Sequence, residues 1–488
     1  MSVGRRLVGD TLVYGFALGF ARTAAFLLVP VFTRLFTPPE YGVYDVVTAL
    51  SRALLVPSVL GMDVGMALLF RDLDGERQRV AASSSLAAQL GWTALVITGL
   101  VAFAPEIASI LLGDRGDKIL IVLGAGILAM QVWNNFVLNL AKWRRDPRRY
   151  LTLTLGAMLL ASALSVAVAV GTELRVLGAL LGLVLGGAIF VPVGAWLVRH
   201  YLAPRISSAD MRECLRFGLP FAANNSADLA LPFLLRLAVI AAVGLGGVGI
   251  FGATLTLCSA VMLISDAVGM AWWPYALSPE ARARVHEDTS RMMRVYAFAL
   301  ALVVAVMLLA AEPLTLALFG GGAFSDAAPL IGPLAFAFWL KSIRQNASVG
   351  LVVVGASWLR AAVNLAAMAA ATLAAFPLAQ RWGGFGAAAG FIAGEVVGLG
   401  LQSWALRRFY RVPVDLRTPS VVGAAIVALM LAASALALAP PDLAIGGRLG
   451  LGLLFPALLL MLGVVRVREI CQVAGFAFAS VKGVSRPR

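Results

Sequence analysis

The sequence predicts an all-α, polytopic integral membrane protein, and three observations support this prediction. Of the 488 residues, 61% are hydrophobic and only 13% are charged, whereas soluble domains carry about 45–50% apolar and about 25% charged residues. Apolar runs of roughly 20 residues, the length that crosses a bilayer, recur along the whole chain. Lysine and arginine gather in alternate connectors between these runs. This composition excludes a soluble enzyme, a secreted disulfide scaffold and a disordered chain.

About fourteen apolar stretches are long enough to span a membrane. In chain order they are 8–33, 41–70, 81–104, 119–141, 150–171, 176–198, 214–242, 247–275, 292–311, 326–352, 360–379, 384–406, 419–439 and 448–465. The first stretch is not a typical cleaved signal peptide, because its apolar run is too long and thirteen more follow. An even number of spans predicts that both termini lie on the same side.

The basic residues predict the orientation of these spans. With the N-terminus in the cytoplasm, the cytoplasmic segments hold 28 lysines and arginines and the external segments hold six. This asymmetry predicts a multi-pass membrane protein with both termini in the cytoplasm. The net charge of +14 then reflects basic loops that face anionic membrane lipids, and it requires no nucleic-acid partner.

The chain contains a candidate internal repeat with a spacing near 207 residues. Basic clusters recur at this spacing, and Tyr41-Gly42-Val43-Tyr44 aligns with Val248-Gly249-Ile250-Phe251. Coincidence between apolar helices is the alternative. A duplication of six spans predicts two parallel six-helix lobes. The expected divisions are an N-lobe at 1–208, a C-lobe at 209–411, and two C-terminal helices with a cytoplasmic tail at 412–488.

A few ionisable side chains lie inside the predicted spans, where each costs about 2.5–3.5 kcal/mol at mid-bilayer. The cations are Arg22, Arg52, Arg236, Lys341 and Arg344. The acids are Asp45, Asp63, Asp228, Asp266 and Glu395. Because arginine binds phosphate oxygens in a bidentate manner, the cations predict a cavity for an anionic headgroup. The acids predict ion coupling or charge pairing. In the competing interpretation, charges such as Arg22 and Asp45 pair and only hold helices together.

The sequence gives no support for a metal or a nucleotide cofactor. Cys214, Cys258 and Cys471 are far apart in sequence and are expected to be free thiols. His200 and His286 fall in polar connectors. No P-loop motif occurs anywhere in the sequence, so any coupling should use a proton gradient, a sodium gradient or the membrane potential.

The turn after the first span carries a family resemblance. The segment Thr33-Arg34-Leu35-Phe36-Thr37-Pro38-Pro39-Glu40-Tyr41-Gly42-Val43-Tyr44 resembles the corresponding turn of bacterial polysaccharide and oligosaccharide (O-antigen type) flippases. These belong to the multidrug, oligosaccharidyl-lipid and polysaccharide exporter superfamily. The resemblance covers essentially the whole chain. It implies a V-shaped cavity between two lobes, with a cationic lining.

The resemblance also implies a function. It implies that undecaprenyl-diphosphate-linked oligosaccharide crosses the inner membrane by alternating access, for lipopolysaccharide or other cell-surface polysaccharide biosynthesis. A glycan polymerase or ligase would be a partner. By residue type and position, Arg22, Arg52, Arg236, Lys341 and Arg344 become candidate substrate contacts. Asp63 and Asp228 become weaker candidates for coupling.

Three other functions compete with this prediction. A peptidoglycan lipid-precursor flippase would suit a cationic cavity equally well. A multidrug/cation antiporter of the same fold should instead have an acidic cavity. A membrane-embedded glycosyltransferase or polymerase would need a large external loop or a catalytic carboxylate/histidine cluster, and the external connectors near 105–118 and 312–325 are short. The sequence therefore predicts a transporter and not an enzyme.

Overall fold

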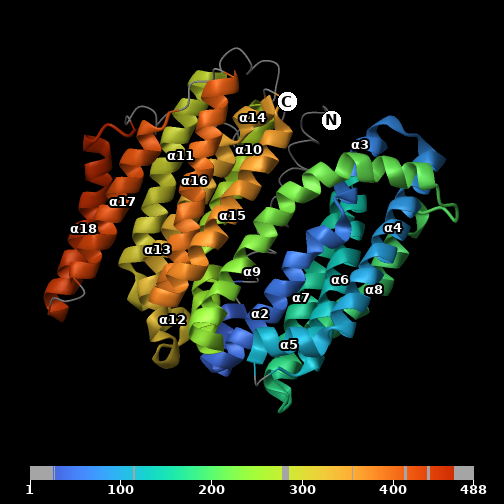
Figure 1. Cartoon of the computed structure of the whole chain (residues 1–488), viewed down its shortest axis with the longest axis horizontal. Coiled ribbons are helices and arrows are strands. Elements are labelled where there is room, and N and C mark those ends of the chain that lie inside the picture. Colours follow the sequence, from blue (N-terminus) through green and yellow to red (C-terminus); the bar gives the residue numbers. More distant parts are fainter. Residues whose placement is uncertain are drawn as a thin grey trace, which may run out of the picture. The chain divides into compact units, whose positions relative to one another are not determined.

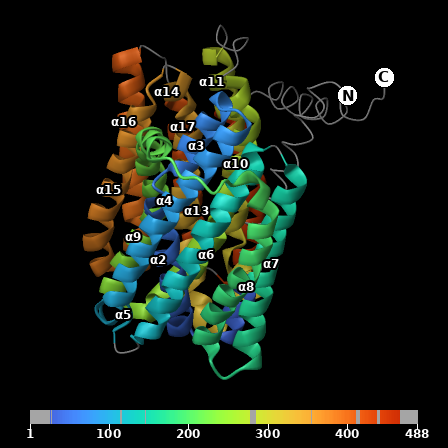
Figure 2. The same cartoon turned by 90° about the vertical axis from the view of Figure 1, so that its right-hand side faces the viewer.

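The computed structural model describes residues 26, 28–113, 116–144, 146–276, 285–353, 355–410, 415–436 and 440–465. Within these residues every regular element is a helix, and no strand occurs among them. Figures 1 and 2 show these helices from two directions. The prediction of an all-α polytopic fold is confirmed.

Eleven helices in the described part of the chain are long and apolar enough to cross a membrane. One of the eleven, Phe221–Met270, contains two of the predicted spans, and the shorter apolar helix Ile445–Met461 coincides with the last one. The predicted span 8–33 lies largely outside the described residues. Each of the other predicted spans overlaps one of these helices.

The described residues divide into two compact units. The first unit contains the described residues up to Ala253 together with Ala375–Ala387, and the second contains Thr254–Ala374 and the described residues from Ala388 onward. The predicted lobe boundary at 208/209 rests on the internal sequence repeat, whereas these two units are defined by compactness. The lobe boundary therefore stays a prediction.

In addition to the helical residues 28–35, the described part of the first unit contains eight α-helices and a short 3₁₀ helix. They are α2 (Pro38–Val59), α3 (Met62–Asp72), α4 (Gly75–Ala102), α5 (Ala104–Leu112), α6 (Lys118–Trp143), α7 (Pro147–Gly171), α8 (Arg175–Val198), η2 (Arg199–Tyr201) and most of α9 (Ser208–Cys258). Helices α6, α7 and α8 pack against one another (Figure 2).

The second unit continues from the end of α9. It contains α10 (Ala260–Ala276), α11 (Val285–Leu309), α12 (Ala311–Phe319), η3 (Gly322–Ala327), α13 (Ala328–Ala347), α14 (Val349–Val353), α15 (Ser357–Trp382), α16 (Gly384–Tyr410), α17 (Arg417–Leu436) and α18 (Pro441–Met461). The far end of α15 and the start of α16 belong to the first unit. Helix α11 packs against α13, α17 and α18.

The predicted span 41–70 is broken into α2 and α3. Leu60 and Gly61 have φ values of 55° and 67°, so both residues lie in the left-handed region and end the helix. A Cβ atom at Gly61 would lie 2.2 Å from the carbonyl oxygen of Gly218 in α9. The break therefore places the α2–α3 junction directly against the backbone of α9, which only a residue without a side chain permits.

Helix α9 also contains a break. Gly244 has φ 70° and ψ −169°, so the helical run Ser208–Cys258 is two helices joined at this glycine. The sequence predicted a connection between 242 and 247, and Gly244 lies in that interval. Glycine is the residue that adopts this backbone conformation at little cost.

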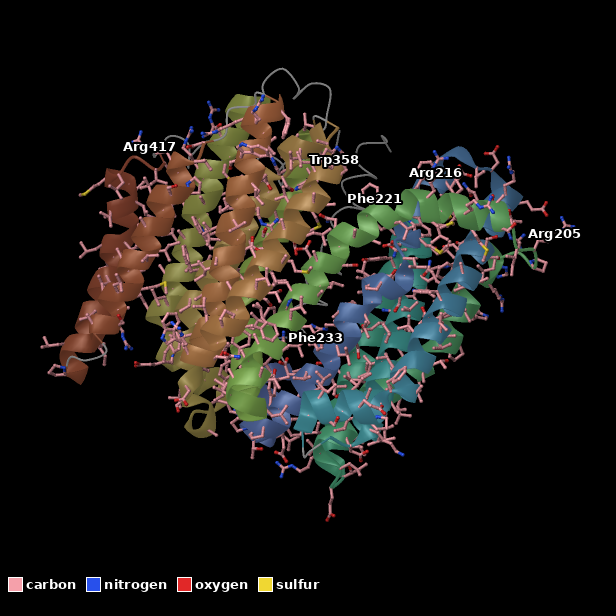
Figure 3. The ribbon with its side chains drawn as sticks, in the orientation of Figure 1. Arg205, Arg216, Phe221, Phe233, Trp358 and Arg417 are labelled. Carbon is pink, nitrogen blue, oxygen red and sulfur yellow. The ribbon has the colours of Figure 1, made fainter. Side chains whose placement is uncertain are left out.

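The connectors of the first unit converge at its two ends. At one end, Arg79 donates two hydrogen bonds to the carbonyl oxygen of Leu202, at 2.8 and 3.1 Å, and the Arg144 guanidinium lies over the rings of Phe70 and Tyr201. The exposed Arg205 and Arg216 lie at this end (Figure 3). These basic connectors are the ones that the sequence assigned to one side of the membrane.

At the opposite end of the first unit, Arg175 reaches the start of α2. Its Nη2 donates to Glu40 Oε2 at 2.8 Å and to the carbonyl oxygen of Leu35 at 3.0 Å. Glu40 Oε2 also accepts from the backbone N–H and hydroxyl of Thr37, which completes a capping box at the N-terminus of α2. The Thr-Pro-Pro-Glu segment of the family turn thus starts α2 and anchors it to α8.

Candidate functional site

A buried ion pair joins α2 to α9 in the first unit. Arg236 donates from Nε to Asp45 Oδ2 at 2.6 Å and from Nη2 to Asp45 Oδ1 at 2.9 Å. Both side chains are almost fully buried, at 7% and 8% exposure. Arg236 Nη1 also donates to the carbonyl oxygen of Pro232 at 2.9 Å. The two charges therefore neutralise each other in a bidentate, charge-assisted pair.

Glycines make room for this pair. A Cβ atom at Gly252 would lie 1.8 Å from Asp45 Oδ2, so the carboxylate occupies the space that a side chain would fill. One turn away, Gly249 lies against the carbonyl oxygen of Pro38, and Gly42 lies against that of Leu245. The start of α2 and the segment of α9 after Gly244 consequently approach backbone to backbone, and Asp45 is placed beside Arg236.

Arg52 lies on the same face of α2 as Asp45, two turns further along the helix. Its side chain is exposed, in contrast to that of Arg236. Within the part of the chain that the structure describes, Arg52 makes no hydrogen bond or ion pair. Arg52 is therefore an accessible cation inside a candidate membrane span.

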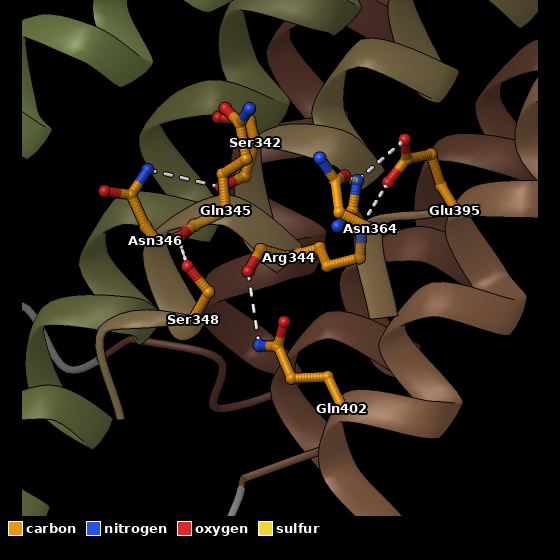
Figure 4. Close-up of polar contacts among 8 residues, drawn as sticks. All are labelled: Ser342, Arg344, Gln345, Asn346, Ser348, Asn364, Glu395 and Gln402. Carbon is orange, nitrogen blue, oxygen red and sulfur yellow. Dashed lines mark hydrogen bonds and ion pairs between the residues drawn. The ribbon is translucent and has the colours of Figure 1, made fainter. Parts of the chain in front are cut away.

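A second buried ion pair lies in the second unit (Figure 4). Arg344 of α13 donates from Nε to Glu395 Oε2 at 2.6 Å and from Nη2 to Glu395 Oε1 at 3.2 Å. The exposures of these two side chains are 5% and 1%. Arg344 Nη2 also donates to Asn364 Oδ1 of α15 at 3.0 Å, so three helices meet at one guanidinium.

The surroundings of Arg344 fix its position further. Gln402 of α16 donates from Nε2 to the backbone carbonyl oxygen of Arg344 at 3.2 Å. A Cβ atom at Gly398 would lie 2.8 Å from Arg344 Cδ. The segment Gly394-Glu395-Val396-Val397-Gly398 thus supplies the carboxylate and, one turn later, the gap that holds the arginine stem.

A neutral polar network lies on the side of α13 opposite Arg344, since Ser342 and Asn346 are two positions before and after it. Asn346 Nδ2 donates to Ser265 Oγ at 3.0 Å and to Tyr296 Oη at 2.9 Å, and the Tyr296 and Ser342 hydroxyls are hydrogen-bonded. These groups satisfy one another's hydrogen bonds away from water, as buried polar groups must. The network joins α10, α11 and α13 within the second unit.

The remaining predicted residues belong to neither ion pair. Lys341 is buried at 6% exposure and interacts with neighbouring groups. Asp63, Asp228 and Asp266 are partly exposed, and Asp228 and Asp266 also interact with neighbours. Arg22 lies outside the described residues. Among the described residues, no group of three or more histidine, cysteine, aspartate and glutamate side chains could hold a metal ion.

The structure thus pairs two of the predicted substrate cations with two of the predicted acids. Asp45 pairs with Arg236, where the sequence offered Arg22 as an example, and Glu395 pairs with Arg344. Asn364, Gly252 and Gly398 were not singled out from the sequence, whereas Gln402 was noted as a polar residue seven positions after Glu395. The signal that could have identified Gly398 is a glycine three residues after an intramembrane acid, in Glu395-Val396-Val397-Gly398.

Comparison with protein families identifies the group to which this architecture belongs. The model of the family described as "Polysaccharide biosynthesis protein" matches residues 31–328, which is more than half of the chain. The chain belongs to this family. The predicted resemblance to polysaccharide flippases is confirmed at the level of family and fold. No curated protein matches the chain by sequence.

Solved structures of transporters share the fold. The lipid II flippase MurJ in an inward closed conformation superposes with a TM-score of 0.74 at 10% identity, over 92% of this chain and 97% of that one. An inward-facing multidrug resistance MATE family transporter of the MOP superfamily has a TM-score of 0.60 at 16% identity, over 84% of this chain and 99% of that one. A MOP superfamily transporter from Pyrococcus furiosus has a TM-score of 0.51 at 16% identity, over 82% of this chain and 95% of that one. This polysaccharide biosynthesis family member therefore has the MOP transporter fold.

Proposed function

We propose that this protein is a flippase that moves an undecaprenyl-diphosphate-linked oligosaccharide from the cytoplasmic to the periplasmic leaflet of a bacterial inner membrane. The family match over residues 31–328 is the observation that carries the proposal. The MOP transporter fold supports a transport role. Alternating access, with both termini in the cytoplasm and a glycan polymerase or ligase as a later partner, belongs to the same proposal.

In this proposal Arg52 contacts the diphosphate. A guanidinium can donate two parallel hydrogen bonds to phosphate oxygens. Arg236 and Arg344 already donate in this manner to Asp45 and Glu395, so their donors are occupied and they hold helices in register. Asp63, which is partly exposed in α3, is the carboxylate to which we assign coupling. Asp63→Asn should make translocation in vesicles insensitive to an imposed proton or sodium gradient, and an unchanged gradient response would contradict this assignment.

Depletion of the protein in its native cell tests the function. We expect lipid-linked oligosaccharide to accumulate in the cytoplasmic leaflet and surface polysaccharide to fall, because synthesis of the lipid-linked unit continues while its transfer stops. Both pools are measured by extraction and by impermeant surface labelling. Unchanged pools after depletion would refute the proposal.

The contrast between Arg52 and Arg236 gives a residue-level test. Arg52→Gln should lower translocation about 10- to 100-fold with unchanged thermal stability, because it removes hydrogen bonds to a charged group worth about 1.5–3 kcal/mol. Arg236→Gln should lower the free energy of unfolding by about 3–5 kcal/mol, because it leaves Asp45 buried and unpaired. Translocation in proteoliposomes and thermal unfolding in detergent measure the two effects. Equal loss of stability in both variants would contradict the distinction.

A second candidate substrate is a peptidoglycan lipid precursor. The fold match to the lipid II flippase over 92% of this chain favours it. Both substrates present a diphosphate to Arg52, so that residue does not distinguish them. Purified protein should be given each lipid in the same vesicles. Translocation of the oligosaccharide-linked lipid but not of lipid II would select the first candidate, and the reverse result would select the second.

A further inference from the structure

One face of α6 carries an unusual set of polar side chains. Gln131, Asn135, Leu138 and Lys142 follow one another at spacings of four, three and four residues, so they share one face of the helix. Asn134 and Asn139 flank this row. All six residues are at least partly exposed, and α6 is one of the apolar helices that could span a membrane.

The other faces of α6 are covered by the first unit itself. Gly187 and Gly194 of α8 lie against Met130 and against Trp133 and Val137. Leu128 and Val132 pack in a cluster with Val59 of α2 and with Val96, Ile97 and Leu100 of α4. Phe136 and Leu140 pack with Met62 and Met66 of α3. Leu138 packs partly against the same cluster. The remaining side of α6 carries Gln131, Asn134 and Asn135, which are partly exposed.

These carboxamides are poorly suited to lipid. An amide that leaves water for hydrocarbon loses hydrogen bonds that nothing replaces. Inside the row, Asn139 Nδ2 donates to Asn135 Oδ1 at 2.9 Å, while Gln131 Oε1 is buried without a hydrogen-bond partner among the described residues. The Gln131 carboxamide is thus left with an acceptor that no group among the described residues uses, although its side chain as a whole is partly exposed.

The chemistry of the row indicates the class of ligand. Each carboxamide offers a neutral donor group and a neutral acceptor group side by side. A phosphate offers acceptors alone and is matched by Arg52 or Lys142, whereas a sugar hydroxyl both donates and accepts. We infer that Gln131, Asn134 and Asn135 of α6 form a binding strip for the hydroxyl groups of the glycan. The inference rests on the proposed function, and it assigns the sugar part of the substrate to the first unit.

A double variant tests the strip and leaves the Asn135–Asn139 hydrogen bond intact. Q131M/N134L replaces two carboxamides by apolar side chains of similar size. Leu138→Met, on the same face, is the matched control. Purified full-length protein is reconstituted with two polyprenyl-diphosphate lipids that carry one sugar or a tetrasaccharide, each with the same dye. Dithionite, which does not cross the bilayer, reports the leaflet.

We expect the double variant to move the single-sugar lipid within about twofold of the wild-type rate. Its half-saturating concentration for the tetrasaccharide lipid should rise about tenfold, because two ligand hydrogen bonds are lost. Its thermal stability should be unchanged or higher, since it removes amides from an apolar span. The control variant should match the wild type with both lipids.

Several outcomes would overturn the inference. Reduced thermal stability with equal loss for both lipids would mean that the carboxamides pack the helices together. Unchanged transport of both lipids would mean that the row contacts only water. Binding is measured separately, as the rise in melting temperature that each lipid causes in detergent. If the wild type binds the tetrasaccharide lipid through the strip but moves neither lipid, the flippase proposal fails and the binding strip stands.

Discussion

Arg344 and Glu395 show how an intramembrane charge can serve structure. Both side chains are at most 5% exposed, and Asn364 accepts a further hydrogen bond from the same guanidinium. Replacing one partner should cost about 3–5 kcal/mol, because the other charge is left buried, whereas replacing a whole pair by apolar residues is often neutral. The double variant R344M/E395L should therefore unfold at a higher temperature than either single variant. Additive losses of stability in this double-mutant cycle would contradict a coupled pair.

Gly252 allows a second test at the residue scale. Gly252→Ala should destabilise the first unit by about 3 kcal/mol, because the new Cβ atom would displace the Asp45 carboxylate that it meets at 1.8 Å. Gly400→Ala in α16 is the matched control, since no heavy atom lies within 4 Å of its Cβ position. The control should gain about 0.5–1 kcal/mol from helix propensity. Thermal unfolding in detergent compares the two, and equal effects would refute the role of Gly252.

At the scale of elements, one ion pair ties α12 to α18 in the second unit. Arg448 donates to both carboxylate oxygens of Glu312, at 2.6 and 2.7 Å. These hydrogen bonds hold the pKa of the Glu312 carboxyl below its usual value of 4.5. A lowered native pKa stabilises the fold above pH 4.5, and this contribution is lost as the pH falls through the native value.

Comparison of the wild type with Glu312→Gln over a range of pH isolates this contribution. The wild type should melt at a slightly higher temperature near pH 7, and the difference should vanish when the pH falls below the native pKa. The effect is small because Glu312 is 61% exposed and its charge is screened by solvent. A difference that persists at acid pH would mean that the carboxylate charge is not its source.

The positions of the helices could be predicted from the sequence, whereas the contacts between helices could not. Apolar runs of membrane length mark the spans, and Gly244 lies where the sequence placed a connection. The break at Leu60 and Gly61 was missed, because a left-handed leucine has no sequence signature and depends on the close approach of Gly218. The sequence did not show which charges pair with each other. Asp45 and Arg236 are 191 residues apart, and sequence spacing gives no information about contacts between residues so far apart in the chain.

At the scale of the whole molecule, the predicted orientation is open to a direct test. The sequence places Arg148 in a cytoplasmic connector and Glu173 in a periplasmic one, and both are exposed. In a background without Cys214, Cys258 and Cys471, Arg148→Cys should react with an impermeant maleimide only after the cytoplasmic face is opened. Glu173→Cys should react in intact cells whose outer membrane is permeabilised. Labelling with the reverse sidedness would invert the topology.

The packing of Gly252 against Asp45 has an evolutionary consequence. The carboxylate, its arginine partner and the glycine that makes room for it form a unit of three positions on two helices. A lineage that loses Asp45 leaves a buried cation at Arg236 and an empty space beside residue 252. Positions 45, 236 and 252 should therefore change together among relatives, with a neutral residue at 236 and a larger residue at 252 wherever the acid is absent.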